Sequence, residues 1–277
     1  MRRKYFLSSL IVQALFLLTA FSEQHTSDMN STNEYWLRVL GDKIVNQKGD
    51  TICLRGFGLG GMLHMENFID GYPANEESMR EGLLKILGEK KYDLYFDTFL
   101  KSYFTDSDAE YIHSLGLNLV RIPINYRLFE DDMNPGVIKE SAFRYLDNVI
   151  ELCARHQIYT IIDLHAFPGS QNQHWHSDNP THVASFWIFK EFQDRGVHLW
   201  EVIAQRYKNQ PWVAGYNPLN EPTEKTGKKL LEFYDRVVNT IREVDPHHLS
   251  SFEACYLLTY SFPRCEHIRL GFFLSQQ

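Results

Sequence analysis

The sequence is poor in cysteine and, beyond its first 22 residues, has no apolar run long enough to cross a bilayer. No two cysteines stand in a CxxC spacing, so a structural zinc site has no signature here. The chain also lacks internal repeats, and its one glycine-rich stretch, 56–61, has neither a Walker lysine nor a dinucleotide fingerprint. These absences argue against an oxidoreductase, and they favour close backbone packing as the reason for the glycines.

The four cysteines permit two disulfides in three different pairings, and the sequence does not choose among them. Cys53 lies in an apolar strand pattern and Cys153 on an apolar helix face, which predicts that both are buried thiols. Cys255 and Cys265 are close enough in sequence for a loop bridge. No particular disulfide is therefore predicted.

The N-terminus has the pattern of a signal peptide. Three basic residues at positions 2–4 precede the apolar run Phe6–Phe21, and Ala20-Phe21-Ser22 has the small residues of a cleavage site. We expect residues 1–22 to be removed and 23–35 to form a polar lead segment. The sequon at Asn30 fits export, so the sequence predicts a secreted glycoprotein; an uncleaved anchor is the alternative.

Composition and charge indicate the size of the domain and exclude some classes of binding partner. The 277 residues are 44% hydrophobic and 14% aromatic, which is enough for one sizeable domain. Without the first 22 residues, 25 basic residues remain against 35 acidic ones, a net charge of −10. A surface this acidic repels nucleic acid and anionic lipid, so we expect neither as a partner.

Apolar strand patterns alternate with helical patterns along the chain, which predicts an α/β fold with a parallel sheet covered by helices. A hairpin (37–39 and 43–45) precedes five expected strands, and a closed (β/α)8 TIM barrel needs eight. The expected fold is therefore an incomplete barrel of about five βα units. The strands are expected at 52–58, 119–124, 159–164, 213–216 and 249–252, and the helices at 76–104, 107–116, 141–156, 183–208 and 226–244.

The most informative segment follows the fourth of these strands. Asn220, Glu221 and Pro222 stand at its carboxyl end, where parallel barrels carry their chemistry. An amide beside a carboxylic acid suits sugar chemistry, since the amide binds a hydroxyl and the acid protonates a leaving oxygen. An exposed turn is the alternative interpretation of the tripeptide.

Two other strand ends support sugar binding. Arg121 lies in an otherwise apolar strand, where it needs a carboxylate partner, and a structural ion pair is the alternative. His165 ends the next strand, and the loop after it contains Asn172, Trp175 and His176. Amides, imidazoles and an indole are the planar hydrogen-bonding and stacking groups that bind sugars.

The histidines also raise the question of a metal. His165, His174, His176 and His182 are crowded in one region, but none pairs with another at i, i+4 beside a glutamate on a helix. We therefore predict no metal and no cofactor.

These residues carry a resemblance to a known family. The glycine-rich first strand, Arg121-Ile-Pro123, Asp163-Leu-His165 and Asn220-Glu-Pro222 occur in the order and spacing of glycoside hydrolase family 5. The sequence is most similar to its exo-glucanase and β-glucosidase-like branches, over residues 36–253. The resemblance implies a (β/α)8 barrel that hydrolyses β-linked glucans or β-glucosides with retention.

The same resemblance implies roles for the site residues. Glu221 is expected to act as the general acid/base, Asn220 to bind the sugar 2-hydroxyl, Arg121 to orient the nucleophile, and His165 to line the subsite at the cleaved bond. The family's nucleophile is a glutamate on the seventh strand. Residues 254–277 lose the strand–helix alternation, and neither Glu253 nor Glu266 has the context of that nucleophile. A truncated, inactive remnant or sugar-binding relic is therefore the alternative function.

Overall fold

The computed structural model describes residues 34–250. The expected signal peptide, the Asn30 sequon, the expected tail at 254–277, Cys255, Cys265, Glu253 and Glu266 lie outside the described residues. None of the helices in the described part is long and apolar enough to cross a membrane.

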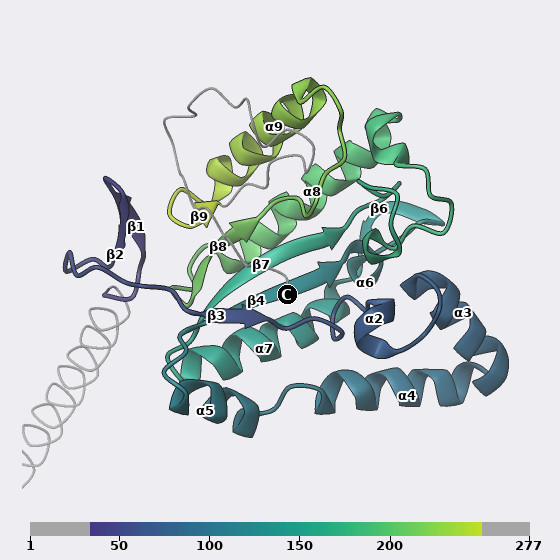
Figure 1. Ribbon diagram of the computed structural model, residues 1–277, viewed down its shortest axis with the longest axis horizontal. Coiled ribbons are helices and arrows are strands. Elements are labelled where there is room, and N and C mark those ends of the chain that lie inside the picture. The colour runs from purple at the N-terminus through teal and green to yellow at the C-terminus, as the bar shows by residue number, and fades with distance from the viewer. Residues whose placement is uncertain (1–33, 251–277) are drawn as a thin grey trace, which may run out of the picture.

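One parallel sheet forms the centre of the fold (Figure 1). Its strands follow one another in the order of the chain, as successive βα units do in a barrel wall. The expected partial (β/α) barrel is confirmed. The strands are β3 (Gly56–Gly58), β4 (Leu119–Asn125), β7 (Tyr159–Ala166), β8 (Val213–Asn217) and β9 (Leu249–Ser250).

The strands approach one another closely at glycine, as the sequence predicted. A Cβ atom at Gly56 would lie 1.6 Å from the carbonyl oxygen of Leu119 on β4. No side chain fits in that space, so the pairing of β3 with β4 requires glycine at this position.

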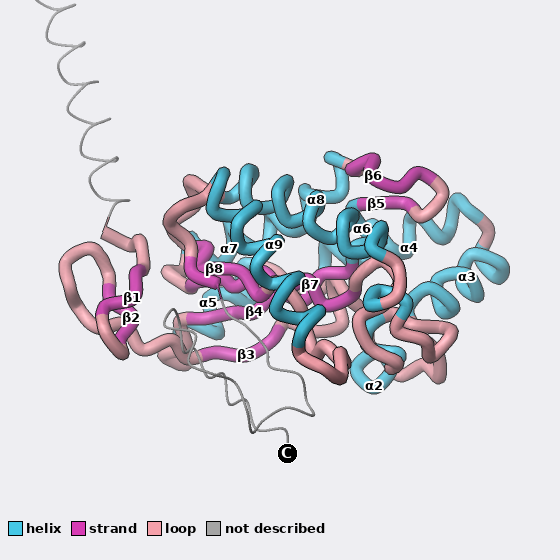
Figure 2. Tube along the Cα trace, turned by 90° about the horizontal axis from the view of Figure 1, so that it is seen from above, coloured by secondary structure: helices cyan, strands magenta, loops and turns pink. Residues whose placement is uncertain are grey.

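Four helices cover one face of the sheet: α5 (Asp106–Ser114), α7 (Phe143–Arg155), α8 (Lys190–Tyr207) and α9 (Lys228–Val244). Figure 2 shows α8 and α9 side by side along the strands. Helical spacing explains this, because α9 buries Leu230, Tyr234, Val237 and Ile241 on one side.

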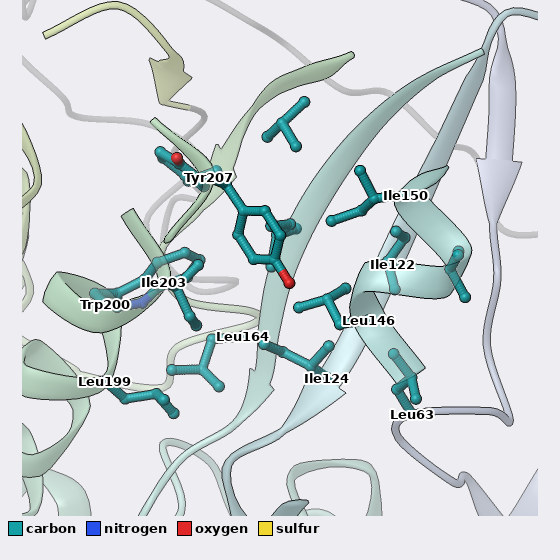
Figure 3. Packing of buried hydrophobic residues seen from close by; sticks show 14 of the residues in the cluster. Leu63, Ile122, Ile124, Leu146, Ile150, Leu164, Leu199, Trp200, Ile203 and Tyr207 are labelled. Atoms are coloured by element: carbon teal, nitrogen blue, oxygen red, sulfur yellow. The ribbon is translucent and has the colours of Figure 1, made fainter. Parts of the chain in front are cut away.

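The main core lies between these helices and the sheet (Figure 3). Alternate residues of β4 point into it, and Ile122 and Ile124 are completely buried there. They meet Leu146 of α7, while Leu164 of β7 faces Leu199 and Trp200 of α8 in the same layer. Burial of each such aliphatic side chain stabilises the folded state by about 1.5–3 kcal/mol. This packing holds the strand ends in place.

The opposite face of the sheet is apolar only near the amino ends of the strands. Leu119, Ile161 and Ala214 form a small cluster there together with Leu37. The predicted hairpin, β1 (Arg38–Leu40) and β2 (Lys43–Val45), lies at this end (Figure 1). Toward the carboxyl ends the same face becomes polar, because Arg121 and Asp163 follow in the alternating pattern.

The helical character expected of segment 76–104 is confirmed, and the segment contains two helices, α3 (Glu76–Leu87) and α4 (Glu89–Ser102), because Gly88 adopts a left-handed φ of 71° between them. One expected helix boundary is wrong. Helix α8 starts seven residues later than expected, after the short 3-10 helix η3 (Ser185–Trp187).

The first expected strand is shorter than predicted, and Cys53 lies outside it. The side chain of Cys53 is exposed, contrary to the prediction, whereas Cys153 is buried as expected. The described part of the chain also contains small elements that the alternation does not reveal: α2 (Asn67–Asp70), α6 (Tyr126–Phe129), β5 (Glu130–Asp131), β6 (Asn134–Ile138) and the 3-10 helix η1 (Glu140–Ala142).

Candidate active site

The polar side chains predicted for the site gather at the carboxyl ends of β4, β7 and β8. Arg121 on β4 and Asp163 and His165 on β7 point to the face away from the main core. Asn220 and Glu221 follow the end of β8. Since the helices hold these three strands in register, residues nearly a hundred positions apart meet at one place.

A buried network orients Asn220. Its side-chain oxygen accepts a hydrogen bond from Arg121 at 2.7 Å, and Arg121 also pairs with Asp163 at 2.9 Å. His165 Nδ1 lies 2.7 Å from Asp163 Oδ2, so the ring donates from Nδ1. The Nε2 atom of His165 is then free to accept from the Asn220 amide at 3.1 Å.

Burial shapes the charges in this network. It raises the pKa of Asp163 to about 6, against the lowering effect of Arg121. Burial also pushes the pKa of His165 well below its ordinary value, so this ring stays neutral. The network therefore supplies a rigid set of hydrogen bonds around the Asn220 amide.

Glu221 occupies an unusual backbone position for a residue with a side chain. Its φ is 44°, in the left-handed region that non-glycine residues seldom adopt. Its carboxylate is 45% exposed and lies 3.0 Å from His176 Nε2. The hydrogen bond with His176 holds the pKa of Glu221 below its ordinary value, although burial opposes this. Strained backbone of this kind is common where a reactive group must be held in one direction.

Hydrogen bonds join the loop between β7 and α8 to the turn that contains Glu221. Gln171 donates to the backbone carbonyls of both His165 and Asn220, at 2.7 and 2.9 Å. Asn172 is completely buried and donates to the backbone carbonyl of Glu221 at 3.1 Å. The amide of Asn172 thus lies against protein groups.

The 3-10 helix η2 (Trp175–Ser177) presents the remaining two predicted residues. His176 contacts Glu221, whereas the half-buried ring of Trp175 lies 6.4 Å from the ring of His182, further along the loop. The structure therefore brings Glu221, Arg121, His165, Asn172, His176 and Asn220 together, whereas the ring of Trp175 contacts His182 and none of these six side chains.

Glu66 belongs to the same site, although the sequence analysis does not single it out. It lies in the segment between β3 and α2, and its carboxylate, 3.9 Å from His165 Nε2, has no hydrogen-bond partner among residues 34–250. Burial raises its pKa to about 7. Its position shortly after the end of a predicted strand is the signal that finds it, because the strand ends of a barrel share one face.

The titration of Glu66 gives a testable pH dependence. The folded protein holds the Glu66 proton up to about pH 7, whereas an ordinary glutamate loses it near 4.5. Its contribution to stability is therefore full below pH 4.5 and is lost by about pH 7, in total about 3 kcal/mol. Glu66→Gln should flatten the fall in unfolding free energy over this range, measured by urea titration at several pH values. The exposed Glu151→Gln is the control and should leave the slope unchanged.

Metal-ligand side chains are also present, and hydrogen bonds engage the Nε2 atoms of their two imidazoles. Ligand atoms of His64, Glu66 and His165 lie within 4.8 Å of one another. However, His165 Nε2 accepts from Asn220, and His64 Nε2 donates to the carbonyl of His176 at 2.6 Å. We therefore treat the trio as part of the hydrogen-bonded site and not as metal ligands.

Solved structures of known enzymes share this fold. Rutinosidase from Aspergillus niger matches with a TM-score of 0.61 and 18% identity, over 73% of this chain and 63% of that one. An endogalactoceramidase matches with a TM-score of 0.59 and 18% identity, over 79% of this chain and 53% of that one. The fold is thus that of the (β/α)-barrel class to which these hydrolases belong.

The sequence comparisons name the family. The model of cellulase (glycosyl hydrolase family 5) matches residues 89–254. A beta-xylosidase of Phanerodontia chrysosporium is 54% identical over 213 residues, which cover 77% of this chain and 45% of that protein. A probable glucan 1,3-beta-glucosidase A of Aspergillus clavatus is 28% identical, over 87% of this chain and 56% of that protein. The chain belongs to glycosyl hydrolase family 5, which confirms the resemblance, and it spans about half the length of these relatives.

Proposed function

We propose that the protein is a secreted, retaining glycosidase that acts on β-linked glucans, β-glucosides or β-xylosides. One observation carries the proposal: a half-exposed carboxylate on a left-handed turn, Glu221, stands at the carboxyl end of β8 beside an amide fixed from two sides. This arrangement suits protonation of a glycosidic oxygen while the neighbouring sugar hydroxyl is held.

Each side chain then has a role that follows from its contacts. Glu221 protonates the leaving oxygen. Asn220 has one amide N–H engaged by His165 and its oxygen engaged by Arg121, which leaves its second N–H for a sugar hydroxyl. Glu66 is protonated below pH 7 and can both donate to and accept from a hydroxyl. Trp175, which precedes His176 in η2, is half-buried and offers an aromatic surface for the CH face of a sugar.

Retention requires a second carboxylate about 5–5.5 Å from the first. The family resemblance puts this nucleophile on a later strand than the five described here. Arg121, expected to orient it, contacts Asp163 and Asn220 within residues 34–250.

Sugar binding without turnover is the second candidate function, and one observation favours it. The two carboxyl groups of the described part that interact with Glu221 as like charges are poorly suited to nucleophilic attack. Asp163 is completely buried and paired with Arg121, and Glu66 is neutral below pH 7. A protein with only this set would bind a sugar and protonate an oxygen, but it would have no group to form a glycosyl intermediate.

Two proteins separate these candidates. One is the 277-residue chain, and the other is a fusion in which the C-terminal part of the Phanerodontia beta-xylosidase follows residue 250. The fusion is chosen because that relative is 54% identical over 213 residues and longer than this chain. We expect the fusion to hydrolyse aryl β-glucosides or β-xylosides, and to do so equally in chelator. Binding without hydrolysis by both proteins would favour the second candidate, and failure of both to bind would contradict the proposal.

Export gives a prediction of its own. We expect expression in a eukaryotic secretory host to give a product that starts near Glu23 and carries a glycan on Asn30, because a basic segment, an apolar core and a sequon occur in this order. N-terminal sequencing and a mobility shift after glycosidase treatment measure both. An intact Met1 in the secreted protein would argue for an uncleaved anchor instead.

A further inference from the structure

We propose that His176 acts as the proton-holding positioning residue of Glu221, so that the two side chains share one proton between Nε2 and Oε2. This inference rests on the proposed role of Glu221 as general acid/base. It changes the expected role of His176 from a sugar ligand to a partner of the acid.

The surroundings of His176 Nε2 carry the proposal. This atom lies 3.0 Å from Glu221 Oε2, an acceptor, and 3.1 Å from Asn172 Nδ2. The Asn172 amide has a fixed orientation, because its Oδ1 accepts from the backbone N–H of His174 and its Nδ2 also donates to the Glu221 carbonyl. The group facing Nε2 is therefore an N–H donor.

A nitrogen between a donor and an acceptor has a partner in both of its protonation states. With a proton on Nε2, the ring donates to Glu221; without it, Nε2 accepts from Asn172. Nε2 and Oε2 stay hydrogen-bonded to each other whichever of them carries the proton, so its transfer breaks no contact between the two side chains.

The loop holds His176 in place for this purpose. The backbone carbonyl of His176 accepts from His64 at 2.6 Å, and Asp178, two residues further along the chain, is buried with a left-handed φ of 53°. Asp178 accepts from Asn75, Asn125 and Arg127, between 2.7 and 3.0 Å. The backbone that carries the imidazole is thus held by contacts that do not involve Glu221.

The other charged groups that face the pair do not replace His176. Arg121 on β4 favours the carboxylate form of Glu221, and Asp163 and Glu66 interact with Glu221 as like charges. His165 on β7 is kept neutral by burial, which lowers its pKa. His174 stacks on His176 with ring centroids 5.3 Å apart, and its exposed ring has no hydrogen bond to Glu221.

The pair resolves a conflict in the chemistry of Glu221. Its lowered pKa makes it ionised at neutral pH, and an ionised carboxylate cannot protonate a leaving group. A proton on His176 Nε2 can reach Glu221 Oε2 in a single transfer. In the first step it passes through Oε2 to the glycosidic oxygen, which keeps the electron pair of the broken C–O bond and leaves as an alcohol, while the nucleophilic carboxylate bonds to the anomeric carbon. In the second step the oxygen of a water molecule displaces that carboxylate from the anomeric carbon, and Glu221 takes the proton that the water loses, which restores the pair.

The test needs no substrate. The 277-residue protein is labelled with 13C at the glutamate carboxyl carbons, and the Glu221 signal is assigned by its loss in Glu221→Gln. We expect the midpoint of this titration to move to higher pH in His176→Phe and in His176→Gln, and to stay unchanged in the matched control His174→Phe. His176→Gln keeps a hydrogen-bonding side chain without the charge, so it separates loss of the proton from loss of shape.

The unaltered protein gives a second measurement that does not depend on the folding of any variant. The Glu221 signal should respond in two steps, because the protons of a coupled pair leave in two steps that belong to the pair and not to either residue. A single step together with unchanged midpoints in the His176 variants overturns the proposal. If the midpoints are unchanged but the protein hydrolyses glycosides, the pair is rejected and the proposed function stands. If the midpoints shift but the protein binds no sugar, the pair stands and the proposed function is rejected.

Discussion

Replacing Glu221 by glutamine in the fusion protein should lower turnover of substrates with poor leaving groups by about 10²–10⁴-fold, the usual contribution of a general acid. Substrates with activated leaving groups, such as nitrophenyl glycosides, should lose less, because their departing oxygen needs little protonation. The measurement is kcat/KM for a matched series of aryl glycosides with leaving groups of different basicity.

Glu224→Gln is the control for this prediction. Glu224 lies three residues further along the same loop, is buried, and accepts from the hydroxyl of Thr226 at 2.8 Å, so the substitution changes charge without reaching Glu221. It should leave the dependence on leaving group unchanged. A uniform loss across the series in Glu221→Gln would show that this residue binds the substrate and does not protonate it.

Arg121→Met should destabilise the fold by about 3–5 kcal/mol, because it leaves the fully buried Asp163 without its cation. The loss is measured as the free energy of urea unfolding at pH 7, followed by circular dichroism. Adding Asp163→Asn to Arg121→Met should recover part of the loss, since the remaining side chain is neutral.

A surface ion pair provides the comparison. Arg206 contacts Asp147 at 2.9 Å, but both side chains are about one-third exposed, so Arg206→Met should cost at most about 1 kcal/mol. Equal losses in Arg121→Met and Arg206→Met would show that the buried pair has no special weight in the fold.

The sequence predicts the sheet because each strand leaves a clear mark. Ile122 and Leu164 stand in apolar runs that are too short for helices and are followed by helical patterns. The order of the strands also predicts the site. Arg121, His165 and Asn220 lie at strand ends, and the strand ends of a barrel share one face.

Local pattern fails where contacts between distant segments decide the structure. The apolar residues before α8 continue the helical spacing, yet Trp187 donates from its indole to the carbonyl of Gln171 and holds this stretch in a 3-10 turn. In the same way, the amide of Asn172 reaches the Glu221 carbonyl across 49 residues, which no spacing rule indicates.

Glu66 shows a different limit of the sequence. Close strand packing accounts for the glycine-rich stretch before it, and this explanation gives no reason to expect a functional side chain in the segment after β3. Its position after a strand end is the signal that the sequence offers, whereas its burial beside His165 is visible only in the structure.

The anomeric configuration of the first sugar product tests the central claim most directly. A time-resolved proton NMR spectrum of aryl β-glycoside hydrolysis by the fusion protein resolves the two anomers before they equilibrate. Our account predicts that the β-anomer appears first and that Glu221→Gln suppresses its formation from substrates with poor leaving groups. Initial formation of the α-anomer, or a rate unaffected by Glu221→Gln, would contradict it.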